Sequence, residues 1–232
     1  MEEKLQALAY LGQDRLCYAD MLEPLRRGTA ELLYAREDGV LLHERRGEVY
    51  MMSARTPEAA RRCLELLPKC ELLVGHEMWY KEQAAKRCGL LEEQICCQAV
   101  WTSPVPPPKP QADLRLLDPS WAPWVYQHYS HSFGGVEYIE AVIRDGMLGV
   151  FVDRKPAGFV GFHAEGSIGM LEVLPAYRRR GLGLALLHGA VRLAMERSAI
   201  PFGQIFADNA PSLRLQERAG MQMAQNKLFW LI

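Results

Sequence analysis

The stretch from Met170 to Leu187 reads MLEVLPAYRRRGLGLALL. Its apolar start is typical of a strand that ends at a proline, and its leucine- and alanine-rich end is typical of a helix. Between them lies a basic turn. Gly181 and Gly183 can adopt backbone angles closed to other residues, so several amide N–H groups can converge on one anion there. Because a helix start adds unpaired N–H donors and the positive end of the helix dipole, the stretch predicts a phosphate-binding turn.

Two familiar glycine motifs do not fit this turn. The P-loop pattern requires a lysine and a hydroxyl residue after its second glycine, and Leu184 and Ala185 stand at those positions. The dinucleotide-binding fingerprint requires a glycine at position 186, which is Leu186. The three arginines Arg178–Arg180 place positive charge around the turn, which suits a phosphorylated ligand.

The residues that fit a known pattern are the strand-end VxP of Val173 and Pro175 and the following RxxGxG of Arg178, Gly181 and Gly183. This combination resembles the coenzyme A pyrophosphate loop of the GNAT acyltransferase superfamily. The resemblance implies that acetyl-coenzyme A is the cofactor. The alternative is a solvated helix N-terminus with incidental arginines.

A second segment, NAPSLRLQERAGM, follows the strand expected at 202–207. In the same superfamily an Asn follows the fifth strand, a small residue comes three positions later, an aromatic hydroxyl comes seven positions later, and Gly-Phe closes the helix. The spacing matches at four of these five positions, which are Asn209, Ser212, Gly220 and Met221. Gln216 stands where the family usually has Tyr. The alternative is that Asn209 serves only as a helix N-cap.

The resemblance implies a function and a set of binding residues. The function is transfer of an acetyl or acyl group from coenzyme A to a primary amine of a small molecule or amino acid. The implied cofactor-binding residues are Val173, Arg178, Arg179, Arg180, Gly181, Leu182, Gly183, Asn209 and Ser212. Because Gln216 replaces a tyrosine, a non-catalytic module that senses acyl-coenzyme A is the alternative function.

The expected catalytic base is Glu172. In a regular strand over 168–174, alternation places Ile168, Met170 and Glu172 on one face. A carboxylate that ends an apolar row is partly desolvated, which suits a general base. A bulge would reverse this parity, and a solvated or salt-bridged glutamate is an equal alternative. His163, Glu165 and an ordered water are the other candidates.

Composition excludes several classes of partner. The net charge is −1, so no overall field favours nucleic acid or an anionic membrane. No apolar run approaches the roughly 18 residues of a membrane span, and the acidic start MEEKLQALAY does not fit a signal peptide. We therefore expect a cytoplasmic protein.

The cysteines indicate structural thiols. All 6 precede residue 98, no pair has CxxC spacing, and no histidine completes a familiar zinc pattern. We expect free thiols and no metal site, with zinc or a disulfide as the alternatives.

The chain is expected to divide at its proline-rich segment. Residues 103–112, SPVPPPKPQA, read as a stiff linker. Residues 113–232 show the order strand, two helices, three strands, helix, strand, helix, strand, which is the GNAT order: an α/β fold with a mixed, mostly antiparallel twisted sheet and flanking helices. The loop that joins the two helices, 129–135, is a candidate wall of the acceptor cleft.

Residues 1–102 show a second α/β pattern without RxxGxG, so they read as a degenerate GNAT-like domain that lacks a cofactor site. This tandem organisation is similar to the FR47-like and glycine N-acyltransferase-like branch. A role for the first domain in shaping the substrate site or in forming a homodimer is a hypothesis, and plain scaffolding is the alternative.

Overall fold

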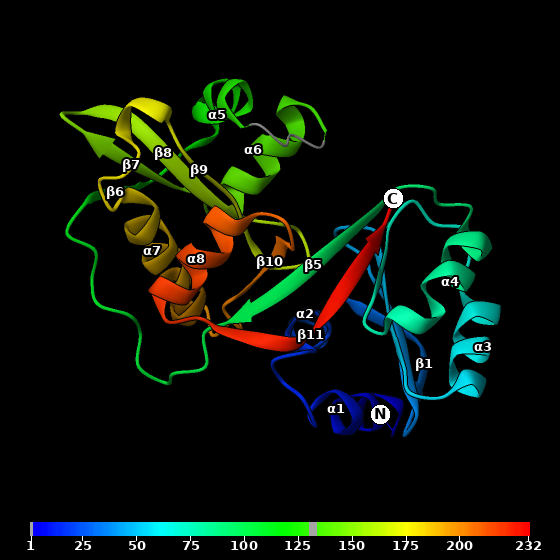
Figure 1. Cartoon of the computed structure of the whole chain (residues 1–232). Helices are drawn as coiled ribbons and strands as arrows, with labels where there is room; N and C mark the ends of the chain where they lie inside the picture. Colours follow the sequence, from blue (N-terminus) through cyan, green and yellow to red (C-terminus); the bar gives the residue numbers. More distant parts are fainter. Residues whose placement is uncertain (1, 130–133) are drawn as a thin grey trace. The chain divides into compact units, whose positions relative to one another are not determined.

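The structure, a computed structural model, describes residues 2–129 and 134–232. These residues form two compact units (Figure 1). The first unit comprises Met1–Val100, Gln204–Leu213 and Gln222–Ile232, and the second comprises Trp101–Gly203 and Arg214–Met221. Each unit is therefore assembled from segments that are distant in sequence.

The second unit has three layers. Its four-stranded sheet has the order β6-β7-β8-β9, and all neighbouring strands are antiparallel. Gly161 of β8 faces Val142 of α6, whereas Leu148, on the opposite face, meets Gly189 of α7. The sheet thus lies between α6 and α7. The elements are β6 (Asp113–Leu116), η2 (Pro119–Trp121), α5 (Ala122–His128), α6 (Val136–Arg144), β7 (Leu148–Val152), β8 (Lys155–Phe162), β9 (Ile168–Val173), η3 (Pro175–Tyr177), α7 (Leu182–Glu196) and the part of α8 (Ala210–Ala219) from Arg214 onward.

The first unit is built on a seven-stranded sheet with the order β1-β2-β3-β4-β11-β5-β10. The pairs β1–β2, β2–β3, β4–β11 and β5–β11 are antiparallel, and β3–β4 is parallel. The elements are α1 (Glu2–Leu11), α2 (Ala19–Arg27), β1 (Ala30–Arg36), β2 (Gly39–Glu44), β3 (Val49–Ala54), α3 (Pro57–Leu66), β4 (Leu73–Gly75), η1 (Met78–Tyr80), α4 (Lys81–Cys88), β5 (Glu93–Val100), β10 (Phe202–Phe206) and β11 (Gln222–Leu231). The mixed, mostly antiparallel α/β fold predicted from the sequence is confirmed.

The terminal strands of the two sequence halves are exchanged. β5 follows β4 along the chain, and β11 follows β10, yet β11 lies between β4 and β5, while β5 lies beside β10. Phe229 of β11 is opposite Gly75 of β4 on one side and Ile95 of β5 on the other. The predicted boundaries 1–102 and 113–232 therefore do not coincide with the compact units. The reason is physical: strand pairing joins segments that no local composition signal connects.

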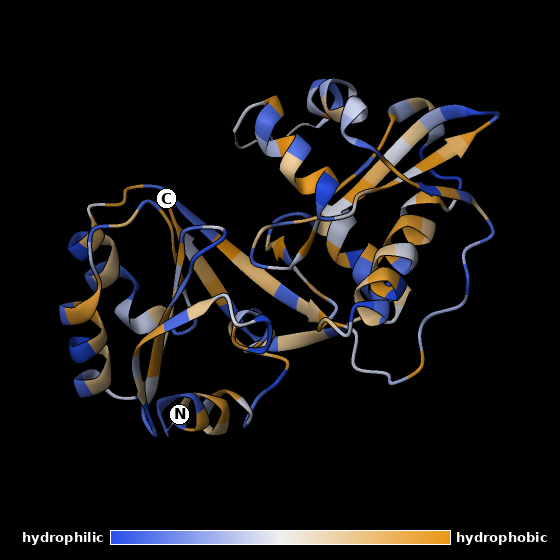
Figure 2. Ribbon diagram, turned by 180° about the vertical axis from the view of Figure 1, so that it is seen from behind, coloured by the Kyte–Doolittle hydropathy of each residue, from blue (hydrophilic) through white to orange (hydrophobic). Residues whose placement is uncertain are grey.

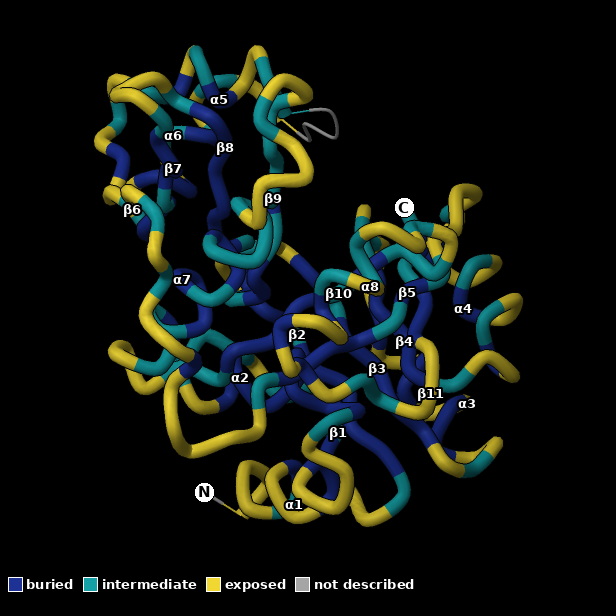
Figure 3. Tube along the Cα trace, turned by 60° about the vertical axis from the view of Figure 1, so that its left-hand side comes forward, coloured by how far each residue is buried: buried dark blue, intermediate teal, exposed yellow. Residues whose placement is uncertain are grey.

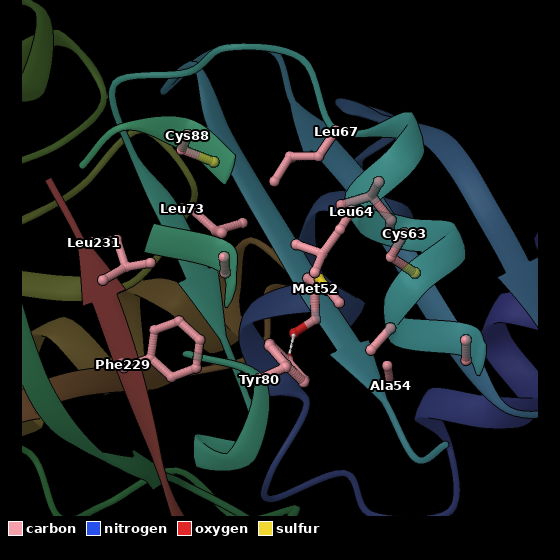
Figure 4. Close-up of a cluster of buried hydrophobic side chains, with 14 residues drawn as sticks. Met52, Ala54, Cys63, Leu64, Leu67, Leu73, Tyr80, Cys88, Phe229 and Leu231 are labelled. Carbon is pink, nitrogen blue, oxygen red and sulfur yellow. Dashed lines mark hydrogen bonds between the residues drawn. The ribbon is translucent and has the colours of Figure 1, made fainter. Parts of the chain in front are cut away.

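The core of the first unit shows this exchange directly. Figure 4 shows Phe229 and Leu231 of β11 among side chains of the first hundred residues. The Phe229 and Tyr80 rings are 5.8 Å apart, and the Tyr80 hydroxyl donates to the Met52 carbonyl over 2.8 Å. Phe229 and Tyr80 are fully buried. The C-terminal strand is therefore an integral part of this core.

Local sequence signals explain the helices around that core. Thr56 caps α3 by accepting a hydrogen bond from Ala59 N over 3.1 Å, and Pro57 occupies the first turn, where no N–H partner is lost. Hydrophilic and hydrophobic residues alternate along α3 (Figure 2), as an amphipathic surface helix requires. Strands β3 and β4 run largely buried, whereas α1 is exposed along much of its length (Figure 3).

The strand expected at 168–174 is observed as β9 over Ile168–Val173, and the strand expected at 202–207 as β10 over Phe202–Phe206. Among the residues that the structure describes, no helix combines the length and the apolar character needed to cross a membrane.

Candidate functional site

The predicted phosphate-binding turn joins β9 to α7 in the second unit (Figure 1). Arg179 and Gly181 have positive φ angles of 63° and 78°, and Arg180 between them does not. Such alternation turns successive backbone N–H groups toward one concave side, which forms an anion-binding nest. The first bond of α7 runs from Ala185 N to the Gly181 carbonyl over 3.1 Å. The amides just before Ala185 therefore have no acceptor within the helix and are available to an anion.

The protein does not block the side-chain positions of the two glycines. A Cβ built at Gly181 would meet no atom within 4 Å, and one at Gly183 would lie 3.5 Å from Leu215 Cδ2 and 3.9 Å from Val173 Cγ2. Glycine at 183 is thus not required by packing of the protein. Its absent side chain leaves room for a ligand to approach the backbone of the turn.

The three predicted arginines differ in their surroundings. Arg178 folds back onto β9, where its Nε donates to the Val173 carbonyl over 2.9 Å and its Nη2 to Glu172 Oε1 over 3.0 Å. The Arg180 guanidinium lies 5.6 Å from the centre of the Tyr177 ring. All three arginines are exposed and lie within one turn of the nest, so they surround it with positive charge.

Strand β9 offers a second binding element, its free edge. In the described part of the chain, β9 lies at the end of its sheet and pairs with β8 alone. The outer edge of an end strand presents backbone donors and acceptors to an extended ligand. Val173, whose carbonyl accepts from Arg178, lies at the end of this edge nearest the nest. Its expected pairing with the pantetheine arm stays a prediction.

The predicted parity of β9 is wrong because the strand contains a bulge. Glu172 is opposite Phe159, whereas Gly169 is opposite Gly161, so β9 has one residue more than β8 between these pairs. Met170 has a φ of 52° at the extra residue. Glu172 therefore shares a face with Gly169 and not with Ile168. That face is the one that α6 covers.

The reversed parity brings Glu172 to a cluster that sequence reasoning did not identify. The cluster comprises Glu172, Tyr129, Tyr138 and His163. The Tyr138 hydroxyl lies 3.0 Å from His163 Nδ1, and a Cβ built at Gly169 would lie 2.2 Å from His163 Nε2, so the imidazole covers Gly169. Burial, and secondarily the charge of Glu172, raises the pKa of Tyr129 to about 12. The spacing of the aromatic residues along α5 and α6 does not predict this arrangement.

The remaining candidate base is less accessible. Glu165 is buried and accepts a hydrogen bond from the Ser167 hydroxyl. Burial, and secondarily the charges of Glu165 and Tyr129, raises the pKa of Tyr138 to about 12. Both tyrosine hydroxyls therefore stay protonated at neutral pH.

The predicted loop 129–135 lies for the most part outside the described residues, because 130–133 are not described.

The second predicted motif behaves as a helix cap. Asn209 Oδ1 accepts from Ser212 N over 3.1 Å, at the start of α8. Both residues belong to the first unit, so their contribution to coenzyme A binding stays a prediction. Gln216 is buried, and its Oε1 has no hydrogen-bond partner among the described residues. The preceding Leu215 packs beside Gly183 of the nest.

Solved structures of similar fold cover nearly all of the chain. A Drosophila protein aligns with a TM-score of 0.70 at 19% identity, over 100% of this chain and 95% of its own. A GNAT-family acetyltransferase from Novosphingobium aromaticivorans gives 0.58 at 17% identity, over 94% and 96%. A GCN5-related N-acetyltransferase-like protein from Streptococcus suis gives 0.58 at 15% identity, over 100% of both chains. At these identities the likeness establishes the fold alone, for both sequence halves.

No curated protein matches the sequence. The model of the acetyltransferase (GNAT) family matches residues 109–221, which contain the nest, the free edge of β9 and Glu172. Residues 109–221 are therefore a domain of the GNAT family of acetyltransferases, whose members use acetyl-coenzyme A as the acyl donor.

Proposed function

We propose that the chain transfers an acyl group from acetyl-coenzyme A to a primary amine of a small molecule or amino acid. The observation that carries the proposal is the nest of Arg179 and Gly181 at the end of the free-edged strand β9. The nest and the start of α7 would hold the pyrophosphate, and the backbone at Val173 would hold the pantetheine arm. When bound, acetyl-coenzyme A supplies the acyl group in activated form, as a thioester.

The main task left to the protein is removal of a proton. An alkyl amine has a pKa of about 10, so it reaches the site protonated at neutral pH. Glu172 is the next-to-last residue of β9, the strand that leads into the nest, and its side chain is 17% exposed, so it is shielded but reachable. We assign it the role of proton acceptor, directly or through a water.

His163 is a weaker candidate for this role. Its Nδ1 faces the Tyr138 hydroxyl, which stays protonated at neutral pH. If that hydroxyl donates to Nδ1, the proton of the neutral imidazole resides on Nε2, which then cannot accept another. We infer that Tyr138 and His163 shape the acceptor side of the site and that Glu172 moves the proton.

Protonation of the departing thiolate needs little assistance. A thiol has a pKa of about 8.5, so the thiolate is a reasonable leaving group without a dedicated acid. Gln216 at the usual tyrosine position is therefore compatible with turnover. Gln216 is also compatible with a second function, that of a module that binds acyl-coenzyme A without catalysis.

One experiment separates the two functions. The purified chain is incubated with acetyl-coenzyme A and a panel of small amines and amino acids, and acetylated products are measured by mass. Product that disappears in Gly183→Asp supports the transferase. Calorimetric binding of acetyl-coenzyme A without any product would refute catalysis on this panel and favour the sensor. A thiol-reagent assay is unsuitable, because the chain carries 6 cysteines.

A further inference from the structure

The first unit contains a second cluster of reactive side chains, which acyl transfer does not use. Cys17 Sγ lies 3.6 Å from His76 Nδ1, and His76 Nε2 lies 3.1 Å from Asp20 Oδ2. All three residues are more than nine-tenths buried. A thiol, an imidazole and a carboxylate joined in this order have the arrangement of a nucleophile, its base and the group that orients the base.

Further hydrogen bonds fix this arrangement. Gln98 Nε2 donates to the Leu16 and Cys17 carbonyls over 2.8 and 2.7 Å, which anchors the backbone that carries the thiol. Asp20 Oδ2 accepts from Gln204 Nε2 over 3.1 Å, and Gln204 Oε1 in turn accepts from Trp230 Nε1 over 2.8 Å. The three groups are therefore held in place before any reagent arrives.

The cluster is not a fully satisfied structural network. Asp20 Oδ1 is buried and has no hydrogen-bond partner among the residues that the structure describes. Buried polar atoms without partners are uncommon in folded proteins, and a redox or catalytic role is one of their explanations. Burial lowers the pKa of His76, but the Asp20 carboxylate raises it more, and the net pKa lies well above its ordinary value. His76 can therefore hold a proton at Nδ1, facing Cys17 Sγ.

Two other cysteines provide a natural comparison. Cys63 and Cys96 are as buried as Cys17, and burial raises the pKa of each thiol to about 12. Neither has a hydrogen bond to a histidine among the described residues. If burial alone governed thiol chemistry in this chain, the three cysteines would react alike.

We propose that Cys17 is a peroxide-reactive thiol, with His76 as its proton carrier and Asp20 as the positioning residue. Burial selects the reagent, because Cys17 is only 5% exposed and hydrogen peroxide is close to water in size. In the reaction the thiol proton is held at His76 Nδ1, and the sulfur forms an S–O bond as the peroxide O–O bond breaks. The sulfur loses two electrons and the peroxide gains them. The His76 proton passes to the departing hydroxide, which leaves as water, and Cys17 becomes a sulfenic acid.

The test uses the folded full-length chain. It is treated with hydrogen peroxide at neutral pH, sulfenic acid is trapped with dimedone, and each cysteine peptide is followed by mass. Cys17 should be modified at least about tenfold faster than Cys63 and Cys96, because His76 Nδ1 lies 3.6 Å from its sulfur and can carry the proton. Equal rates at the three sites would overturn the proposal. This comparison lies within one wild-type molecule and requires no variant.

Two further measurements test the assigned roles. Asp20→Asn keeps the size and an acceptor for Gln204 but removes the charge, and it should slow Cys17 about tenfold with Cys63 and Cys96 unchanged. An unchanged Cys17 rate would refute the role of Asp20. If this variant unfolds, all three rates rise together, and the wild-type comparison decides alone. Cumene hydroperoxide should modify Cys17 far more slowly than hydrogen peroxide, and equal rates would refute selection by size.

Discussion

Replacing Glu172 by Gln should slow acyl transfer by about 10²–10⁴-fold and leave the fold and the affinity for acetyl-coenzyme A nearly unchanged. Gln keeps the size of the side chain, and its amide oxygen can still accept from Arg178 Nη2, now 3.0 Å from Glu172 Oε1. Basicity is lost. The effect should therefore appear in turnover and not in cofactor binding.

The expected magnitudes separate catalysis from stability. The Arg178 and Glu172 side chains are 57% and 17% exposed, and an exposed ion pair of this kind contributes at most about 1 kcal/mol. A hundredfold loss of rate corresponds to about 2.7 kcal/mol of barrier height. Loss of the ion pair thus cannot account for the expected loss of turnover. Thermal unfolding of the variant should confirm that the fold is retained.

The assay measures acetylated amine by mass at saturating concentrations of both substrates. Raising the pH should partly rescue Glu172→Gln, because more of the acceptor amine is then neutral. The matched control is Glu165→Gln, which should retain most of the rate, and His163→Gln is measured beside it as the other candidate base. If Glu172→Gln turns over at the wild-type rate from about pH 6 to about pH 9, Glu172 is not the base, and the larger loss between His163→Gln and Glu165→Gln identifies its replacement.

Three further results are expected. Gly183→Asp should abolish acetyl-coenzyme A binding in calorimetry. Gly183→Ala should weaken it only partly, because the added Cβ lies at an ordinary contact distance of 3.5 Å from Leu215 and carries no charge. Unchanged affinity in folded Gly183→Asp would exclude the nest as the cofactor-binding site. A fragment of residues 103–232 should be insoluble or unfolded, since β11 loses β4 and β5, its neighbours on both sides; a folded, monomeric fragment by circular dichroism and light scattering would contradict this. Tyr129 and Tyr138 should ionise near pH 12 instead of 10, so their contribution to stability is complete below pH 10 and is lost as the pH rises toward 12. Tyrosinate absorbance and the free energy of unfolding, measured over the same pH range, test this.

The sequence was most informative where a motif and its structure are local. The nest and the start of α7 lie within a few residues of each other, and the glycines and arginines that build them are read directly from RxxGxG. The hairpin between β7 and β8 is equally local, since Asp153 and Arg154 take the positive φ angles of 49° and 63° that a tight turn requires. Such features depend on backbone preferences that neighbouring residues determine.

Non-local pairing explains what the sequence could not predict. The exchange of β5 and β11 is decided by which strand edges meet, and a proline-rich segment between them signals a break in composition without fixing the partners. The same limit applies to Cys17, Asp20 and His76. Their separation along the chain hides a cluster that becomes apparent only when α2 and the strands of the first unit are folded together.

The bulge in β9 shows how one residue can decide a catalytic assignment. In a regular strand Glu172 would share the face of Ile168 and lie away from α6, apart from Tyr138 and His163. The extra residue at Met170 turns Glu172 to the α6 face while leaving Val173 at the free edge beside the nest. A positive φ at a non-glycine residue costs on the order of 1 kcal/mol or more, so packing must maintain it. Met170 is 2% exposed and belongs to the core cluster beneath α5 and α6, which supplies that packing. The bulge thus joins the cofactor-binding edge to the acceptor face, and Glu172 stands at the junction.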